Sequence, residues 1–514
     1  MSYTLKQFFQ EAQIGGIPDW FGDIVLRHRK IKDFKPRFEQ IQDLNMMFVY
    51  SNLRSGLFNE QGTGKTLPGQ AFAIYHAAKG NRCVCLMPRS LLVQFETNLY
   101  FTFQGIEKHI RSEIYHGDKE KRDATVGRWA QFGAPEIALT NYHVFAKEFM
   151  LFRHFDYNAM LADESKVLSN PDAAQYMAIQ EFLGDEGARY FVPMNGTPAG
   201  NTLADLYGNI KMLTPWVYKD RQDFDNKHII YKRIRVRINN NGNANGLRRR
   251  NVNVIEDYDN LDELTENLYL QSRRTEKTSL NLPPLEEIPV PFELSPAHQE
   301  AYDQFINERM MEFDDGSILD GTSSAGLRTA AFQSIVRPDI LGVNEVSMLF
   351  ELIETLIEGA GGKVFIMAHY QKTVEALRDY FKALNPAVIY GKTRNIDREK
   401  QKFINEPTCK VLIVNFESGG VGLDGLQDVC CTGIVAEPTT VPKQYDQARD
   451  RLHRGGQVNP VHMYFPKARG TVFVKAMNDL RKKKNWINSV VTVGQMRDEL
   501  RGFDDGDEDE VVEF

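Results

Sequence analysis

The chain has 514 residues, more than one hydrophobic core usually organises, so two or more domains are expected. Hydrophobic residues make up 42% and charged residues 25%, as in an ordinary globular protein. The formal net charge of −7 argues against an evenly basic nucleic-acid-binding protein, and no apolar run is long enough to form a membrane-spanning helix.

Charge is segregated along the chain. Residues 504–514 (DDGDEDEVVEF) carry seven acids and no base, so the rest of the chain is formally neutral. Residues 226–250 contain eight Lys or Arg and no acid. A local basic surface for nucleic acid is therefore compatible with the acidic average. The acidic tail is expected to be disordered in isolation.

Two sets of apolar bursts alternate with helical segments and predict the strands of two parallel sheets. A helical extension over residues 1–35 comes first. Each burst ends in polar residues or a Gly/Pro cluster, where open α/β sheets place their binding residues. The predicted fold class is α/β with two parallel-sheet lobes. The bursts are residues 83–88, 136–141, 157–164 and 190–198 in the first lobe, and residues 363–369, 387–391, 410–418 and 432–438 in the second.

Between the two sets, residues 228–258 predict a basic β-hairpin insertion. Residues 228–238 alternate like a strand, residues 239–246 (NNNGNANG) read as a loop, and residues 248–258 are the return strand. Alternation would put the first three arginines on one face. The hairpin is either a solvated surface element or a protrusion that contacts phosphates. Its arginines are Arg233, Arg235, Arg237, Arg248, Arg249 and Arg250.

A glycine-rich segment, GTGKT at residues 62–66, lies between a predicted strand at 56–60 and a predicted helix at 67–80. Such a context favours an ATP and Mg²⁺ site over a chance glycine-rich turn. The loop residues Gly62, Thr63 and Gly64 would turn backbone N–H groups toward phosphate oxygens. Lys65 would neutralise the β and γ phosphates and Thr66 would ligate Mg²⁺. Asn59 stands where the common pattern has its first glycine.

Asp163 and Glu164 end the apolar burst AMLADE and predict the catalytic carboxylates. Asp163 would hold Mg²⁺ through water, and Glu164 would orient and deprotonate the attacking water. Gln40, in KPRFEQIQ, is a candidate for reading adenine, with an ordinary helix glutamine as the alternative and Gln42 as a rival.

Two arginines three residues apart, Arg451 and Arg454, lie in the segment DQARDRLHRGGQ at residues 446–457. They predict arginine fingers that stabilise charge on the transferring phosphoryl group, with Arg454 as the closer one.

Six strings in order resemble those of the Swi/Snf family of DNA-translocating ATPases, within helicase superfamily two, over residues 38–466. The most specific is NGTPAGNTLADLYGNIKML at 195–213. The resemblance implies two RecA-like lobes, at residues 36–287 and 288–502, followed by the tail at 503–514. The other strings are PRSLLVQFETNL (88–99), TNYHVF (140–145), RRTEKTSLNLPP (273–284), ESGGVGLDGL (417–426) and DQARDRLHRGGQ (446–457).

The chain departs from the family pattern at two motifs. DESK at residues 163–166 replaces the usual DEAH or DEAQ, and Asp424 stands where Asn is usual. The resemblance places Gly422 and Asp424 at the nucleotide. An acid at position 424 would repel phosphate, so a contact between this loop and the DNA backbone is less expected. Residues 257–277 resemble the branch that includes annealing and fork-remodelling members. No bromodomain-like, chromodomain-like or SANT-like segment occurs, so a nucleosome remodeller is not expected, and the length fits a compact bacterial or phage type better.

The resemblance further implies contacts with the DNA backbone by Ser90, Thr140, Asn141, Thr393 and Arg394. The alternatives are a strand cap for Thr140 and Asn141 and a solvated side chain for Arg394. Phosphate contacts carry no sequence information, so binding should be sequence-tolerant and salt-dependent.

Three functions remain open from the sequence. The first is an ATP-driven duplex DNA translocase that remodels forks or branched DNA in replication, recombination or repair. The second is a strand-separating or branch-migrating helicase with the hairpin as a wedge. The third is an ATP-regulated factor, recruited through the acidic tail, that displaces a polymerase or other protein from DNA.

A cytoplasmic monomer is expected, in a bacterium or in the host of a phage. The first residues lack the basic-then-apolar order of a secretory signal. The five cysteines include no CxxC pair and indicate reduced core residues, not a disulfide framework or zinc site.

Overall fold

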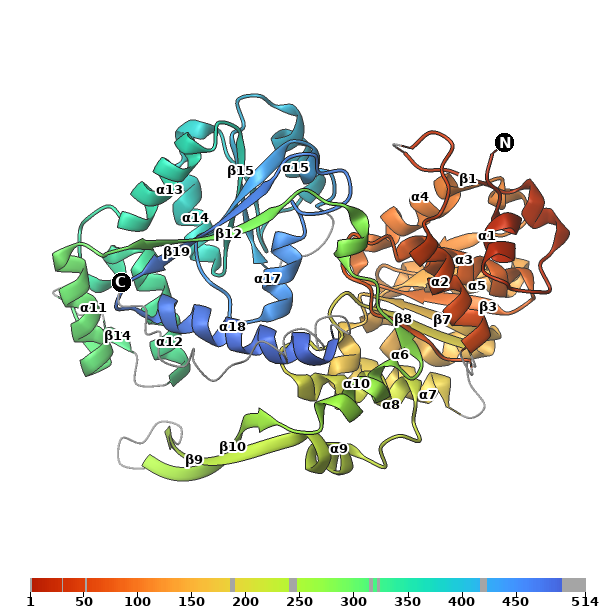
Figure 1. Ribbon diagram of the computed structural model, residues 1–514, viewed down its shortest axis with the longest axis horizontal. Coiled ribbons are helices and arrows are strands. Elements are labelled where there is room, and N and C mark those ends of the chain that lie inside the picture. The colour runs from red at the N-terminus through yellow and green to blue at the C-terminus, as the bar shows by residue number, and fades with distance from the viewer. Residues whose placement is uncertain are drawn as a thin grey trace. The chain divides into compact units, whose positions relative to one another are not determined.

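The structure is a computed structural model that describes residues 2–29, 31–50, 53–184, 190–239, 247–313, 318–320, 324–416 and 423–491. Its contacts divide the chain into two compact units. Unit 1 contains Met1–Tyr231, Ile255–Ser279 and the chain from Trp486 onward, and unit 2 contains Lys232–Val254 and Leu280–Asn485. Each unit is built on its own parallel sheet (Figure 1), which confirms the predicted α/β fold class.

A seven-stranded sheet organises unit 1, and all its neighbouring strands run parallel. Cys83 and Cys85 face one hydrophobic core, whereas Val84 and Leu86 face another. Because side chains alternate along a strand and both faces are buried, the strand sequences are continuously apolar. In sheet order the strands are β11 (Ser272–Arg273), β2 (Gly56–Leu57), β8 (Tyr190–Met194), β7 (Tyr157–Asp163), β3 (Arg82–Leu86), β6 (Ile137–Thr140) and β5 (Ser112–Ile114).

A six-stranded parallel sheet organises unit 2 in the same way. Val364 and Ile366 face one core, and Phe365 and Met367 face the other. Each of the predicted apolar bursts overlaps a strand of one of the two sheets. In sheet order the strands are β12 (Leu285–Phe292), β19 (Val461–Ala468), β18 (Cys430–Val435), β15 (Lys363–Ala368), β17 (Val411–Asn415) and β16 (Ala387–Ile389).

Helices pack on the two faces of each sheet (Figure 1). Among the described residues, no helix has both the length and the apolar character needed to cross a membrane. The helices that begin in unit 1 are α1 (Leu5–Glu11), α2 (Phe38–Asn45), α3 (Thr66–Ala78), α4 (Leu92–Thr102), α5 (Lys119–Phe132), α6 (Tyr142–His154), α7 (Ala174–Leu183), α8 (Leu206–Leu213), α9 (Arg221–His228) and α10 (Leu261–Tyr269).

The helices that begin in unit 2 are α11 (Pro296–Glu308), α12 (Ser324–Val336), α13 (Met348–Gly359), α14 (Gln371–Tyr380), α15 (Ile396–Asn405), α17 (Pro442–Arg449) and α18 (Val472–Val491).

The N-terminal extension is part of the core of unit 1. Helix α1 begins with a capping box, in which the Thr4 hydroxyl accepts from the Gln7 amide and the Gln7 side chain accepts from the Thr4 amide. Leu5, Phe8 and Phe9 are fully buried among the residues that also cover the sheet. A short antiparallel pair, β1 (Val25–Leu26) with β4 (Phe103–Gln104), ties the end of the extension to the segment after α4.

The predicted hairpin is present as β9 (Ile229–Asn239) and β10 (Leu247–Tyr258), which form a two-stranded sheet. Its tip, residues 240–246, lies outside the described residues. A second small pair joins β13 (Met310–Glu312) to β14 (Ile318–Asp320). The expected lobe boundary, residue 287, falls within β12, which pairs with β19 over its whole length and so belongs to the unit 2 sheet.

Candidate functional site

The glycine-rich loop connects β2 to α3 at the carboxyl edge of the unit 1 sheet. Gly62 and Gly64 have φ angles of 85° and 82°, in the left-handed region that favours glycine. A Cβ at Gly64 would lie 2.6 Å from Gln40 Nε2. Position 64 therefore requires glycine for two reasons: its backbone is left-handed, and a side chain there would clash with Gln40.

Lys65 is positioned to meet an anion. It is only 9% exposed, and among the described residues no carboxylate or carbonyl pairs with its ammonium group. Helix α3 begins at the next residue, Thr66, so its first N–H groups have no carbonyl within the helix. The positive end of the helix dipole faces the same loop. A nearly buried cation beside a helix N-terminus fits the phosphates of a nucleotide.

Gln40 is fastened to the glycine-rich loop. Its Nε2 donates to the Gly64 carbonyl at 2.9 Å, and its Oε1 accepts from the Arg37 amide at 3.0 Å. The Arg37 guanidinium also donates to the Thr63 carbonyl. The rival Gln42 lies two residues further along α2 and so on a different face of that helix. Recognition of adenine by Gln40 stays a prediction. The structure adds that the Gln40 side chain contacts the glycine-rich loop.

Asp163 and Glu164 lie at the same edge of the sheet as the loop. Leu57 of β2 is in register with Met194 of β8, and Met194 is in register with Asp163 of β7. Gln61, within the loop, donates to Glu164 Oε1 at 3.4 Å. The structure therefore brings together the loop and the carboxylates that the sequence predicts for one site.

The backbone at this carboxylate pair is constrained. Asp163 is 8% exposed, and its Oδ1 accepts from the Glu164 amide at 2.9 Å. The Tyr142 hydroxyl donates to the Asp163 carbonyl at 2.7 Å. Glu164 has a φ of 49°, a left-handed conformation that is costly for a non-glycine residue and typical of functional sites. Together with the Thr66 hydroxyl, Asp163 offers the oxygen ligands that Mg²⁺ prefers beside substrate phosphates.

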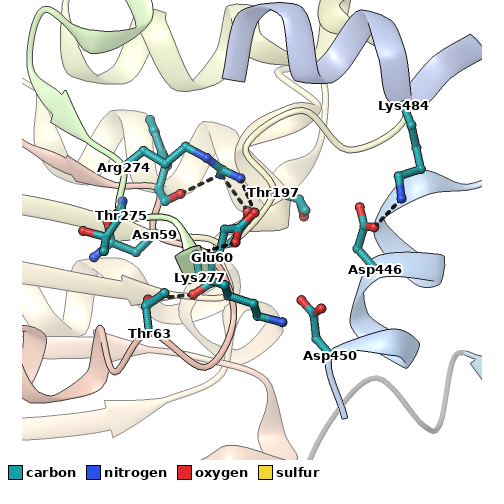
Figure 2. Close-up of polar contacts among 12 residues, drawn as sticks. Asn59, Glu60, Thr63, Thr197, Arg274, Thr275, Lys277, Asp446, Asp450 and Lys484 are labelled. Carbon is teal, nitrogen blue, oxygen red and sulfur yellow. Dashed lines mark hydrogen bonds and ion pairs between the residues drawn. The ribbon is translucent and has the colours of Figure 1, made fainter. Parts of the chain in front are cut away.

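A clamp that the sequence reasoning missed holds the entry to the loop, and we call Asn59, Glu60, Arg274, Thr275 and Lys277 the entry clamp (Figure 2). Asn59 Oδ1 accepts from the Thr275 amide at 2.9 Å. Glu60 Oε1 pairs with Arg274 Nη2 at 3.0 Å, and its Oε2 accepts from the Lys277 amide at 2.8 Å. Two features of the sequence could have indicated this clamp. They are the acid Glu60, just before the glycine-rich segment, and the arginine pair at residues 273–274.

The entry clamp explains why Asn59 stands where the common glycine-rich pattern has its first glycine. Asn59 Nδ2 donates to Asp43 Oδ2 at 2.6 Å, and Asp43 also pairs with Arg273 at 3.3 Å. Asn59 is fully buried, so its amide joins α2 to the segment that follows β11. A glycine at position 59 would make neither side-chain bond.

Asp43 should make the stability of unit 1 depend on pH. Burial raises its pKa from 3.8 to about 7, although Arg273 and Asn59 oppose the change. The folded carboxyl keeps a proton that the unfolded one has lost, so its contribution to stability falls as pH rises from about 4 to 7 and is constant above. Relative to Asp43→Asn, the free energy of unfolding should fall by at most about 1.4 kcal/mol per pH unit in that window.

The measurement is urea unfolding followed by tryptophan fluorescence at several pH values, since Trp20, Trp129, Trp216 and Trp486 all belong to unit 1. Asp19→Asn, at an exposed ion pair with Lys6, is the control and should show no such window. A constant difference between the wild type and Asp43→Asn from pH 4 to 8 would contradict the assignment.

In unit 2, Asp424 contacts both predicted finger arginines. Its Oδ1 lies 3.7 Å from Arg451 Nη1 and forms an ion pair with Arg454 Nη1. The resemblance implied a place for Asp424 at the nucleotide, which stays a prediction; the structure adds that its carboxylate contacts both arginines predicted to be fingers. Gly422, the other loop residue implied by the resemblance, lies outside the described residues.

A neighbouring arginine, Arg449, has acidic partners of its own. Its side chain lies 3.1 Å from Asp450, 3.4 Å from Asp446 and 3.8 Å from Glu287. Burial alone would lower the pKa of Arg449, but these three carboxylates raise it. Asp446 also pairs with Lys484 of α18 at 3.0 Å (Figure 2). Arg449 therefore anchors α17 and β12, a structural role distinct from that of the finger arginines.

The predicted DNA contacts of unit 1 divide into exposed and buried residues. Ser90 is exposed in the turn before α4. Thr140 is fully buried, and its hydroxyl donates to the Tyr115 carbonyl at 2.8 Å. Asn141 is the N-cap of α6 and accepts from the amides of His143 and Val144, both at 3.0 Å. The structure therefore favours the capping alternative for Thr140 and Asn141, because neither side chain is available at the surface.

In unit 2, Thr393 and Arg394 line a cavity of about 710 Å³ together with Arg378, Lys382 and Arg398. Arg394 is exposed, whereas the Thr393 hydroxyl donates to the Val388 carbonyl at 3.2 Å. In the hairpin, Arg233 is exposed on β9. The side chains of Arg235, Arg237, Arg248, Arg249 and Arg250, and the whole tail at 503–514, lie outside the described part of the chain.

Two family models match the chain. The SNF2-related domain matches residues 39–338, and the helicase conserved C-terminal domain matches residues 346–456. Among curated proteins, the chain is 22% identical to the ATP-dependent DNA helicase DDM1 of Arabidopsis thaliana over 88% of this chain and 61% of that protein. It is also 22% identical to the SWI/SNF-related matrix-associated actin-dependent regulator of chromatin subfamily A member 1 of Mus musculus, over 90% of this chain and 44% of that protein. The chain thus spans less than two thirds of the length of each of these two relatives.

Among solved structures, the Sulfolobus solfataricus SWI2/SNF2 ATPase core in complex with dsDNA is 20% identical, with a TM-score of 0.38, over 91% of this chain and 95% of that chain. Because the SNF2-related model alone covers more than half of the 514 residues, the chain belongs to the SNF2-related (Swi/Snf) family of helicase superfamily two.

Proposed function

We propose that the chain is an ATP-driven translocase on duplex DNA that remodels forks or branched DNA. The observation that carries the ATPase part is the row Leu57–Met194–Asp163, which sets the glycine-rich loop and the carboxylate pair at one sheet edge. Membership of the SNF2-related family supports DNA as the substrate on which ATP hydrolysis acts.

Each residue of this site has a role in phosphoryl transfer. Lys65 neutralises charge on the phosphates, and Glu164 orients the attacking water and takes its proton. Thr66 and Asp163 would hold Mg²⁺, which supplies further neutralisation of the phosphate oxygens. Arg451 and Arg454 stabilise the charge that develops on the transferring group.

Cationic side chains that act on His116, one of them next to Ser90 in the sequence, support binding to the DNA backbone. Burial lowers the pKa of His116, and the charges of Arg89, Arg122 and Lys121 lower it further. His116 Nδ1 lies 3.0 Å from Asn141 Nδ2, which places His116 beside the N-terminus of α6. Backbone contacts of this kind tolerate any sequence and weaken with salt.

The test is ATPase activity measured without nucleic acid and with single-stranded DNA, duplex DNA, branched DNA and RNA. Stimulation should be strongest with branched or duplex DNA, and Glu164→Gln should bind ATP but turn it over slowly in every condition. Equal stimulation by all polymers, or by RNA alone, would contradict the proposal. A strand-displacement assay on blunt, forked and four-way substrates separates remodelling from true unwinding, because a translocase of this kind should leave the blunt duplex intact.

The hairpin provides a separate prediction about DNA binding. Replacing Arg233, Arg235 and Arg237 together with Ala should weaken binding uniformly across sequences, because phosphate contacts are lost. The slope of log affinity against log salt should flatten by about one for each lost contact. Fluorescence anisotropy with two unrelated duplexes measures both effects.

The matched control replaces three exposed lysines of unit 1, Lys32, Lys79 and Lys108, which removes the same charge elsewhere. If the hairpin variant and this control share the slope of the wild type, the hairpin is a solvated surface element.

A further inference from the structure

One carboxylate, that of Asp424, is shared by the two arginines expected to act on the phosphoryl group. Its Oδ1 contacts Arg454 Nη1 directly and Arg451 Nη1 at 3.7 Å. The side chains of Arg451 and Arg454 are 10% and 24% exposed, whereas that of Asp424 is 43% exposed. The acid therefore reaches the arginines from the solvent side of the group.

The backbone on both sides of this contact is fixed. Asp424 stands between the buried residues Leu423 and Leu426, and the Gly425 amide donates to Gln427 Oε1 at 3.1 Å. On the arginine side, the Arg454 carbonyl accepts from the Gln457 amide at 3.0 Å. Leu452, between the two arginines, is also fully buried. The contact is therefore set by two anchored segments and does not depend on a mobile surface side chain alone.

The charge balance of this group differs from that of its neighbour. Arg449 meets three carboxylates, from Asp446, Asp450 and Glu287. Asp424, Arg451 and Arg454 themselves carry two positive charges and one negative charge, so Asp424 alone does not balance both arginines. An incoming phosphoryl group must nevertheless compete with the Asp424 carboxylate for the same guanidinium hydrogens.

We propose that Asp424 is a positioning residue that holds Arg451 and Arg454 together in the resting enzyme and limits basal ATP turnover. This inference rests on the proposed function of the two arginines. A finger accelerates hydrolysis by the difference between its interaction with the transition state and its interaction in the ground state. An ion pair in the ground state reduces that difference, so the carboxylate at position 424 slows turnover.

The test compares Asp424→Asn, which removes the charge at nearly constant shape, with Asp424→Glu, which restores it. Asp428→Asn is the matched control, since Asp428 is an exposed aspartate four residues along the same segment. Without DNA, Asp424→Asn should raise kcat by about two- to fivefold, the range expected when a partly exposed ion pair is lost. The KM for ATP should change by less than twofold. Asp424→Glu and Asp428→Asn should both stay close to the wild type.

A double-mutant cycle distinguishes positioning from an indirect effect on the fold. If Asp424 acts through the two arginines, the Asp424→Asn change should have a smaller effect in an Arg454→Ala background, where only the contact with Arg451 remains. The thermal unfolding midpoint of each variant checks that unit 2 remains folded. A fall in kcat in Asp424→Asn, or an equal rise in both backgrounds, would overturn the proposal. Absence of ATP hydrolysis by the wild type under all conditions would instead refute the proposed function, so the two failures are distinguishable.

Discussion

Replacing Lys65 with Ala should abolish ATP hydrolysis and weaken ATP binding. Lys65 is nearly buried beside Gly62–Gly64, and its ammonium group would meet the phosphates together with backbone N–H groups, whereas the Arg37 guanidinium at the same loop is bonded to the Thr63 carbonyl. Loss of the Lys65 ammonium group leaves the β and γ phosphates without their closest positive charge in a site of low solvent access, where charge interactions are strong. Phosphate release in steady state and the affinity for a fluorescent ATP analogue measure the two effects.

Lys79 provides the matched control. It caps the other end of the same helix, α3, and is exposed. Lys79→Ala should hydrolyse ATP at the wild-type rate. Retention of a substantial fraction of wild-type turnover by Lys65→Ala would show that the nucleotide binds elsewhere.

Replacing Arg454 with Ala should reduce kcat by about 10³-fold or more while the affinity for ATP changes little, because a finger acts on the charge of the transition state. Arg451→Ala should have an effect of the same kind, and we expect the larger effect at Arg454. Single-turnover hydrolysis at saturating ATP, combined with direct ATP binding, separates the chemical step from affinity.

The control for this prediction is Arg469→Ala, which removes an arginine of unit 2 paired with Glu293 at the surface. It should leave both kcat and ATP affinity unchanged. If Arg454→Ala lost only affinity and regained the full rate at saturating ATP, the finger role would be wrong for this residue.

The sheets could be predicted because their strands are apolar on both faces. Residues 364–368 and 411–414 are continuous apolar runs, and each lies in an interior strand of its sheet. Strand β5, at Ser112–Ile114, was missed because its residues are only half-buried and give no apolar burst. Strand β11 consists of two residues, Ser272 and Arg273, whose pairing with β2 depends on a partner far away in the chain. Short edge strands are set by such long-range pairing more than by local pattern.

In the candidate site, too, residues with a local sequence pattern could be predicted, whereas residues that depend on distant contacts could not. The loop at 62–66 has a local pattern that constrains its own backbone, so the sequence identified it. The entry clamp joins Asn59 to Thr275 and Glu60 to Lys277, pairs that are 216 and 217 residues apart. The buried hydrogen bond of Thr140 to the Tyr115 carbonyl and the capping role of Asn141 likewise depend on the folded surroundings, which residue type alone does not predict. The ion pair of Asp424 with Arg454 was missed for a similar reason, since the charge of an acid predicts repulsion of phosphate but not which cation it meets.

The entry clamp has a consequence for the order in which this protein is made. The glycine-rich loop emerges early in synthesis, but the residues that fasten its entry, Arg274, Thr275 and Lys277, emerge some two hundred residues later. Contacts between such distant residues form late, after the intervening chain has been released. During translation, Asn59 and Glu60 therefore remain without these bonds until the segment after β11 has left the ribosome. A nascent chain that ends before residue 274 would carry the loop sequence without the contacts that hold its entry.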